Sequence, residues 1–197
     1  MDEEKRRLRR LFSGRRSSLA EAERRAFDEA IREKLRGLPL FSSSPAVAAF
    51  CASGAEPDLL PALGGKRLFL PRYNGGQRTY ELVEIADLRG DLVPGRYGIA
   101  EPHPGLAAAD RDFVKSEVLF LVPAVACDRT GTRLGRGGGF YDRLLAGAAK
   151  PPVGVIYSCQ LGDALPRGEH DVPLGWIVTE TEVIKCSTEG SSLPSKE

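Results

Sequence analysis

The chain has 197 residues, of which 28% are charged and 42% hydrophobic, and its formal net charge at pH 7 is +1. This composition is typical of a soluble globular protein of one domain, long enough to bury a substantial core. The near-neutral balance favours neither a nucleic acid nor an acidic partner for the molecule as a whole. No apolar stretch reaches the roughly 18 residues of a membrane span, and the N-terminus lacks the apolar segment of a signal peptide.

The cysteine pattern indicates a reducing compartment. Four cysteines occur without any paired metal-binding spacing and without a disulfide framework. Cys51 and Cys127 lie inside apolar runs and are typical of small buried hydrophobic residues. We therefore expect a cytoplasmic protein.

The first 36 residues form a basic segment with two predicted helices. They hold 12 Lys and Arg against 8 Asp and Glu, whereas the rest of the chain holds 16 against 19. One helix is predicted over residues 3–12. A second is predicted to start near Ser18, where Ser18 and Glu21 form a capping-box pattern, and to end at Gly37 and Pro39. The basic residues are either a solvated helix face or an anion-binding arm.

The next hundred residues alternate apolar and turn-forming segments. Buried strands are predicted over Ala46–Ala52 and Arg67–Leu70, and a more alternating strand over Tyr80–Ile85. A helix is predicted over Asp58–Leu63. Residues 91–105 form a long irregular stretch rich in Pro and Gly, and loops of this length in compact domains are often functional.

The second half of the chain contains its most apolar strand. Val118–Val122 is expected at the centre of the sheet, followed by a helix over Phe140–Ala149 and strands over Val153–Tyr157 and Trp176–Thr179. Strands that alternate with helices predict an α/β three-layer sandwich, with a largely parallel central sheet flanked by helices and with basic N-terminal helices. We expect a single domain over residues 1–186 and a disordered polar tail over 187–197.

Residues 121–143, LVPAVACDRTGTRLGRGGGFYDR, carry the most informative local pattern. An apolar strand leads into a cationic glycine-rich loop with a helix behind it, which is a physical arrangement for holding phosphate. In α/β sheets ligands bind beyond the carboxyl ends of the strands, where this loop should lie. The pattern GxxxxGK[ST] is absent, and Phe140 stands where GxGxxG would need its third glycine, so the common phosphate loops are excluded.

The run RLGRGGGFYDR resembles the signature of the 5-formyltetrahydrofolate cyclo-ligase family, also called methenyltetrahydrofolate synthetase. Further segments are similar to that family in the same order along nearly the whole chain. They are Lys5-Arg6-Arg7-Leu8-Arg9, Glu56, Leu70-Pro71-Arg72, Tyr97-Gly98-Ile99-Ala100-Glu101-Pro102, Gln160, His170-Asp171-Val172-Pro173 and Ile177-Val178-Thr179-Glu180.

Three positions depart from the family pattern. Ala124 stands where the family usually has Gly, Cys127 where it usually has Phe, and Gly175 where it usually has Asp. The first two are small or apolar and change the packing at a strand end, whereas Gly175 could loosen a loop near the site. None removes a charge that the chemistry obviously requires.

The resemblance implies an ATP- and Mg²⁺-dependent cyclisation of 5-formyltetrahydrofolate to 5,10-methenyltetrahydrofolate, with release of ADP and phosphate. Phosphorylation of the formyl oxygen turns a poor leaving group into phosphate, so positioning and charge stabilisation carry the catalysis. The implied ligands are ATP, a reduced folate and Mg²⁺. No nucleic acid or membrane partner is implied, and we expect a monomer.

The resemblance also implies which residues form the site. Arg133 and Arg136 are the candidate catalytic residues, because guanidinium groups grip phosphate oxygens with paired donors. Asp142 and Asp171 are the implied Mg²⁺ ligands. The implied ATP-binding residues are Lys5, Arg6, Arg7, Leu8, Arg9, Arg133, Leu134, Gly135, Arg136, Gly137, Gly138, Gly139, Phe140 and Tyr141, and the implied substrate-binding residues are Arg9, Cys51, Glu56, Tyr97 and Tyr141.

Each of these roles has a structural alternative. Asp142 could stabilise the dipole of the helix that it begins, and Asp171 could form a turn. Phe140 and Tyr141 either flank a pterin or adenine ring or belong to the core. Glu56 either contacts the pterin or is simply an acid at the start of a helix.

Two other functions remain open from the sequence. One is a non-catalytic or altered-specificity relative that binds nucleotide or folate, which Gly175 and Ala124 favour. The other is a nucleic-acid-binding protein that uses residues 5–16, although no recognisable binding motif occurs elsewhere. A hydrolase triad is not expected, because the two histidines have no Ser or Cys partner at a recognisable spacing.

Overall fold

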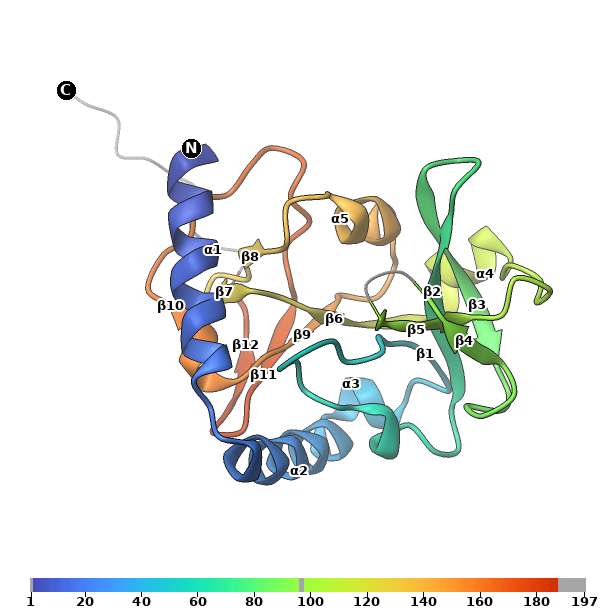
Figure 1. Cartoon of the computed structure of the whole chain (residues 1–197), viewed down its shortest axis with the longest axis horizontal. Helices are drawn as coiled ribbons and strands as arrows, with labels where there is room; N and C mark the ends of the chain where they lie inside the picture. The colour runs from blue at the N-terminus through green and yellow to red at the C-terminus, as the bar shows by residue number, and fades with distance from the viewer. Residues whose placement is uncertain (1, 96–97, 188–197) are drawn as a thin grey trace.

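A seven-stranded sheet between two helical layers forms the centre of the molecule (Figure 1). The structure, a computed structural model, describes residues 2–95 and 98–187. The strand order is β12-β11-β9-β6-β1-β2-β3, and all neighbours are parallel except the two edge pairs β2–β3 and β11–β12. The predicted α/β class with a largely parallel sheet is therefore confirmed.

Strand β6 (Leu119–Pro123) is the middle strand, as its apolar run predicts. It lies between β1 (Ala46–Ala48) and β9 (Val153–Val155). Its side chains alternate between two separate cores, because successive residues of a strand point to opposite faces. The outer strands are β2 (Arg67–Asn74), β3 (Thr79–Ile85), β11 (Trp176–Val178) and β12 (Val183–Lys185).

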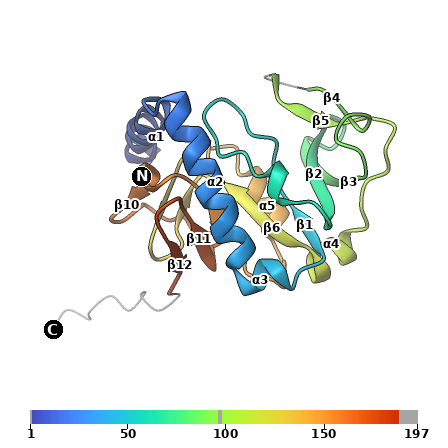
Figure 2. The same cartoon turned by 90° about the horizontal axis from the view of Figure 1, so that it is seen from below.

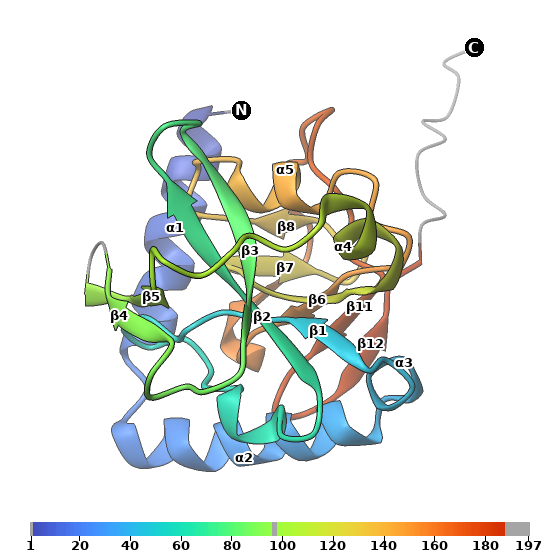
Figure 3. The same cartoon turned by 90° about the vertical axis from the view of Figure 1, so that its right-hand side faces the viewer.

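Different helices cover the two faces of the sheet (Figures 2 and 3). Helix α2 (Glu21–Gly37) and the short α3 (Pro39–Ser42) pack on one face through Ile31, Leu35 and Phe41. Helices α4 (Arg111–Glu117) and α5 (Phe140–Leu145) cover the other face. These layers bring the glycine loop, which precedes α5, to one end of the sheet.

Helix α1 (Asp2–Ser17) stands at the side of the sheet and packs against a second, small sheet. That sheet has the order β10-β7-β8 and joins Leu161–Gly162, Ala126–Asp128 and Arg133–Leu134. Leu8 and Phe12 of α1 form a core cluster with apolar side chains of the small sheet. This contact fixes the N-terminal helix beside the glycine loop.

Several predicted boundaries were wrong. Helix α2 is capped at Ala20, whose N–H donates to Glu23 at 2.8 Å, whereas the Ser18 hydroxyl donates back to the carbonyl of Arg15. The helix predicted over residues 58–63 is a single 3₁₀ turn, η1 (Leu60–Ala62). Strand β1 is shorter than predicted, because the chain leaves it at residues that line a cavity. Helix α5 ends at Leu145, shortly before Gly147, whose φ of 80° is not helical.

Other elements were not predicted. The irregular stretch 91–105 contains a hairpin of β4 (Leu92–Pro94) and β5 (Ala100–Pro102). Helix α4 is capped by Asp110, whose carboxylate accepts two backbone N–H groups. The edge strand β12 was also not predicted, because its segment has no clear apolar pattern. Within the described ranges, every helix falls short of the length and apolar character that crossing a membrane requires.

Candidate functional site

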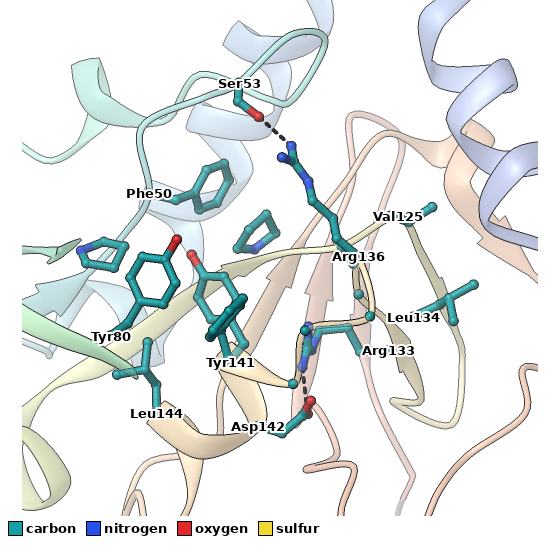
Figure 4. Close-up of a pocket in the computed structure, with 18 of the residues that line it drawn as sticks. Phe50, Ser53, Tyr80, Val125, Arg133, Leu134, Arg136, Tyr141, Asp142 and Leu144 are labelled. Carbon is teal, nitrogen blue, oxygen red and sulfur yellow. Dashed lines mark hydrogen bonds and ion pairs between the residues drawn. The ribbon is translucent and has the colours of Figure 1, made fainter. Parts of the chain in front are cut away.

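A cavity of about 380 Å³ opens where β1 and β6 end. Its walls come from α1, the loop after β1, the β2–β3 hairpin, the glycine loop and the segment that carries Asp171 (Figure 4). The predicted position of the glycine loop beyond the carboxyl ends of parallel strands agrees with this geometry. The cavity thus joins segments from both ends of the chain.

The glycine loop needs glycine for two different reasons. Gly137 and Gly139 have φ angles of 102° and 63°, which side-chain-bearing residues rarely adopt. At Gly138 a Cβ atom would lie 2.4 Å from the Phe140 ring, so only glycine lets the backbone pass there. Gly139 then caps α5, whose first residues Phe140, Tyr141 and Asp142 line the cavity.

Arg133 is a buried cation at the floor of the site. Its side chain is only 4% exposed, and its Nη2 atom donates to Asp142 Oδ1 at 2.6 Å. The guanidinium also lies 5.6 Å from the centre of the Tyr141 ring. Among the described residues the buried Nε atom has no hydrogen-bond partner, so this cation retains unused donor capacity.

Two residues of α1 reach the cavity, as their one-turn spacing predicts. Lys5 Nζ pairs with Asp171 Oδ2 at 2.9 Å, and Arg9 Nε donates to the carbonyl of Gly135 at 2.8 Å. Partial burial raises the pKa of Asp171, but the Gly168 N–H and the Lys5 ammonium outweigh it and hold that pKa below its ordinary value. Asp171 is therefore a carboxylate at neutral pH.

Arg136 reaches across the mouth of the cavity to the loop after β1 (Figure 4). Its Nη2 atom donates to the Ser53 hydroxyl and, at 2.7 Å, to Glu56 Oε1. Glu56 is 7% exposed, and its Oε2 atom accepts the backbone N–H and the hydroxyl of Ser53 at 3.1 and 3.0 Å. The glycine loop is thereby tied to the residue for which a pterin contact is predicted.

One wall of the cavity is aromatic and apolar. Phe140 packs edge-on against Tyr80 with ring centres 4.8 Å apart, and Phe50, Pro71 and Leu144 line the same side. Figure 4 shows Phe50, Tyr80 and Leu144 on the same side as Tyr141. Of these wall residues the sequence had indicated Phe140 and Tyr141 as candidate ligand contacts.

Two further predicted substrate contacts, Tyr141 and Cys51, also line the cavity. Burial raises the pKa of the Tyr141 hydroxyl, and it raises the pKa of the Cys51 thiol. Both groups are thus neutral at pH 7. They can offer hydrogen bonds or apolar contact, but neither is an anion.

Three of the predicted ligand residues that the structure describes are not brought to the cavity. Arg6 and Arg7 are exposed on α1 and do not line it. Leu8 is buried in the cluster between α1 and the small sheet, so its side chain serves packing. Tyr97 lies outside the described residues, and its predicted role stays a prediction.

The donor set fits a magnesium ion that is shared with phosphate. Asp142 and Asp171 both line the cavity, and the N–H of Val172 lies 3.4 Å from Asp142 Oδ1. Over the described residues there is no group of three or more His, Cys, Asp or Glu side chains that could hold a metal alone. Mg²⁺ commonly uses one or two carboxylates and completes its shell with waters and substrate phosphates, so two aspartates are sufficient.

Asp128 orients the loop between β7 and β8 and is not a cavity residue. Its Oδ1 atom accepts the N–H groups of Thr130 and Thr132, and its Oδ2 atom accepts the N–H of Leu165 at 2.9 Å. Nearby, the buried Gln160 amide donates to the carbonyls of Ala124 and Val125 at 2.8 and 3.0 Å. These two residues shape the strand end that presents Arg133.

The departures from the expected sequence pattern have structural explanations. A Cβ at Gly175 would lie 2.3 Å from Pro151 Cβ, so this chain needs glycine there, and Gly175 does not line the cavity. Cys127 is fully buried in the core below α5, and its thiol packs near Gly154. Ala124 is 5% exposed and lies at the cavity edge.

Some residues of the site carried too weak a signal to be found in the sequence. Tyr80 and Phe50 belong to apolar strand patterns that predict core positions as readily as a ligand wall. Ser53 and Asp2 are single polar residues in predicted loop or helix ends. Only their convergence on the cavity distinguishes them.

Comparisons with known proteins all lead to one family. The model of the 5-formyltetrahydrofolate cyclo-ligase family matches residues 1–180. The 5-formyltetrahydrofolate cyclo-ligase of Mycolicibacterium smegmatis is 35% identical over 87% of this chain and 91% of its own length. The corresponding protein of Escherichia coli K12 is 31% identical over 86% and 96%. The NMR structure of Aquifex aeolicus 5,10-methenyltetrahydrofolate synthetase matches with a TM-score of 0.80 at 36% identity, over 96% of this chain and 95% of that one.

Proposed function

The chain belongs to the 5-formyltetrahydrofolate cyclo-ligase family, and we propose that it closes the ring of 5-formyltetrahydrofolate at the expense of ATP. In this reaction the formyl oxygen attacks the γ-phosphorus of ATP, and the bond from that phosphorus to the bridging oxygen breaks, which releases ADP. Nitrogen 10 then attacks the formyl carbon and gives up its proton. The bond from that carbon to the former formyl oxygen breaks, and phosphate leaves with this oxygen and takes up the proton. The product is 5,10-methenyltetrahydrofolate.

One observation carries this proposal: a single cavity brings a cluster of basic side chains, most of them paired with carboxylates, next to an aromatic wall. Lys5, Arg9, Arg133 and Arg136 line it together with the glycine loop, whereas Phe50, Tyr80 and Phe140 line its other side. A polyphosphate and a flat heterocycle can therefore be held next to each other. Holding two reactants in contact is the main requirement of a phosphoryl transfer.

The cationic side suits the triphosphate. Arg136 is 55% exposed and reaches the cavity mouth, so it can turn towards an incoming phosphate. Arg133 is fixed below it, with a buried Nε atom for which the described residues supply no acceptor. We assign Arg133 to stabilising the charge that develops during transfer and Arg136 to gripping the nucleotide.

Asp142 and Asp171 are the residues that would hold Mg²⁺. When bound, the ion would neutralise part of the charge of the polyphosphate. Each aspartate is also paired with a cation of the same cavity, Asp142 with Arg133 and Asp171 with Lys5. These ion pairs place both carboxylates before any ligand arrives.

The aromatic side suits the reduced folate. The edge of a pterin carries adjacent N–H donors, and the buried Glu56 carboxylate at the boundary between the two sides can accept them. Tyr80, Phe140 and Tyr141 provide ring surfaces beside it.

We further propose that the protein acts as a cytoplasmic monomer. Cys51, Cys127, Cys159 and Cys186 are all free thiols, which suits a reducing compartment.

A non-catalytic relative is the second candidate function, and one of its two sequence hints is weakened. Gly175 does not line the cavity, and a Cβ there would lie 2.3 Å from Pro151 Cβ, whereas Ala124 does lie at the cavity edge. Every charged side chain that the proposed chemistry uses is present in the cavity. The catalytic function is therefore preferred.

The direct test mixes purified protein with 5-formyltetrahydrofolate, ATP and Mg²⁺ and follows the near-ultraviolet absorbance of the methenyl product. We expect absorbance to rise only when all three are present, with one ADP formed for each product molecule. Folate binding without product would favour the non-catalytic relative. Salt-sensitive binding to arbitrary DNA duplexes without folate affinity would instead indicate a nucleic-acid-binding protein.

A further inference from the structure

Arg16, at the end of α1, is a buried arginine that the proposed chemistry does not use. Its side chain is 11% exposed, and its Nη1 atom lies 3.6 Å from Glu56 Oε1. Within the described residues its buried Nε and Nη1 atoms have no hydrogen-bond partner. Burying a guanidinium without hydrogen bonds is costly, so its retention here calls for a physical reason.

The same carboxylate oxygen of Glu56 faces two guanidinium groups. Arg136 holds it at 2.7 Å from the solvent side, and Arg16 lies behind it at 3.6 Å, just outside the usual hydrogen-bond range of about 2.7–3.2 Å. The two arginines differ in freedom, since the Arg136 side chain is 55% exposed and the Arg16 side chain is enclosed. The Arg136 side chain can therefore move away from Glu56, whereas the Arg16 side chain is held beside it by burial.

Burial lowers the pKa of Arg16, while the negative charge of Glu56 raises it and the positive charge of Arg136 lowers it further. The positive charges of Arg16 and Arg136 therefore repel each other, and both are stabilised by the single negative charge of Glu56. Removal of Arg136 from the pair would strengthen the contact between Arg16 and Glu56. Ser53 fixes the other oxygen of Glu56 through its N–H and hydroxyl, so the carboxylate itself stays in place.

We propose that Arg16 is a positioning residue that takes over Glu56 when a nucleotide draws Arg136 away. In this structure Arg136 contacts the Glu56 carboxylate oxygen that the pterin would need. When Arg136 turns to the triphosphate, Arg16 supplies the compensating charge and keeps the Glu56 carboxylate oriented towards the folate. Binding of nucleotide and folate is thereby coupled through one carboxylate, an inference that rests on the proposed function.

The coupling has a definite sign. Nucleotide binding exposes the Glu56 oxygen to the folate, so each ligand should tighten the binding of the other by the same factor. Without Arg16, release of Arg136 would leave Glu56 buried beside no cation, so both the nucleotide and the coupling would weaken. This effect should occur although Arg16 does not line the cavity.

The test measures, by isothermal titration calorimetry, the Kd of 5-formyltetrahydrofolate with and without saturating adenylyl-imidodiphosphate and Mg²⁺. We expect the analogue to tighten folate binding by about fivefold or more in the wild type. Arg16→Gln should reduce this factor to about one, with the folate Kd in the absence of nucleotide little changed, because Arg136 still holds Glu56. Arg16→Lys should restore part of the coupling. Arg10→Gln, an exposed change of equal charge on the same helix, should leave the factor unchanged.

A double-mutant cycle separates positioning from a general loss of structure. In a Glu56→Gln background the coupling factor should be near one, and adding Arg16→Gln should not change it further. A wild type that binds both ligands without coupling would overturn the inference and leave the proposed function intact, as would an Arg16→Gln variant with undiminished coupling. If Arg16→Gln fails to fold, Arg16→Lys becomes the deciding variant. This protein keeps a positive charge at position 16, so complete loss of coupling in a folded Arg16→Lys variant would contradict the proposed role. A wild type that binds neither ligand would overturn the proposed function and this inference together.

Discussion

The charged and the aromatic sides of the cavity are built in different ways. On the charged side the ion pair of Lys5 and Asp171 spans 166 residues of sequence, and that of Arg136 and Glu56 spans 80. On the aromatic side, Tyr80 and Phe140 are held by packing between the β2–β3 hairpin and α5. Ion pairs can exchange partners when a charged ligand arrives, whereas packed rings cannot. The charged side is therefore suited to respond to a ligand, and the aromatic side to present a fixed shape.

Removing the buried cation of the charged side should have the largest effect. Arg133→Met deletes the guanidinium and leaves Asp142 without its partner at 2.6 Å. We expect turnover to fall by about a hundredfold. We also expect the free energy of unfolding to fall by roughly 3 kcal/mol, because one member of a buried pair is left alone. Steady-state kinetics and urea unfolding measure the two effects.

Arg129→Met is the matched control for that variant. Arg129 also pairs with a carboxylate, that of Glu182, but its side chain is 61% exposed and lies away from the cavity. This change should leave turnover unaltered. If Arg133→Met behaved like the control, Arg133 would have no role in charge stabilisation.

The two sides can be separated by their Michaelis constants. Arg136→Gln should raise the KM for ATP by about tenfold at saturating folate, with the KM for folate at saturating ATP nearly unchanged. Tyr80→Ala should do the reverse, raising the KM for folate by about tenfold through loss of ring contact. Tyr80→Phe, which keeps the ring, should retain most of this ring contact and raise that KM less than Tyr80→Ala. Equal effects of Arg136→Gln and Tyr80→Ala on both constants would show that the two sides do not bind separate ligands.

The smallest effect is expected from a change at Glu81, which follows Tyr80 in β3, and it concerns stability. Partial burial raises the pKa of Glu81, but Arg72 and Asn74 outweigh it, so that pKa lies below its ordinary value of 4.5. A lowered folded-state pKa stabilises the fold above the unfolded pKa, and this contribution is lost as the pH falls through the folded value. Urea unfolding should therefore show a deficit for Glu81→Gln near pH 7 that shrinks below about pH 4. A deficit that is independent of pH would contradict this assignment.

The sequence predicted the elements that the local pattern alone determines. The apolar run that forms β6 is fully buried, and its central position follows from the need to cover both faces of a parallel strand. Helix α2 and the end of that helix at Gly37 and Pro39 also agreed. By contrast, β12 and the small sheet β10-β7-β8 have two or three residues per strand, too few for a periodic signal. They form because neighbouring strands offer unpaired backbone groups.

The candidate site divides in the same way. The glycine loop could be identified because its residues are required locally, by positive φ at Gly137 and Gly139 and by the approach of Phe140 to Gly138. Tyr80 and Arg16 could not be identified from the sequence. The segment around Tyr80 fits a core strand as well as a ligand-binding wall, and the segment around Arg16 fits a solvated helix face as well as a buried charge.

By itself the sequence determined the family, the order of the elements and the residue types that the chemistry needs. Those features depend on local backbone conformation, on hydrophobic periodicity and on motifs that stand in a fixed order. Only the tertiary structure decided which charges meet: Lys5 with Asp171, Arg133 with Asp142, and Glu56 between Arg136 and Arg16. These pairings depend on how α1 packs beside the small sheet and on where the loop after β1 turns. Such long-range distances are set by the burial of the whole core and leave no mark at the individual positions.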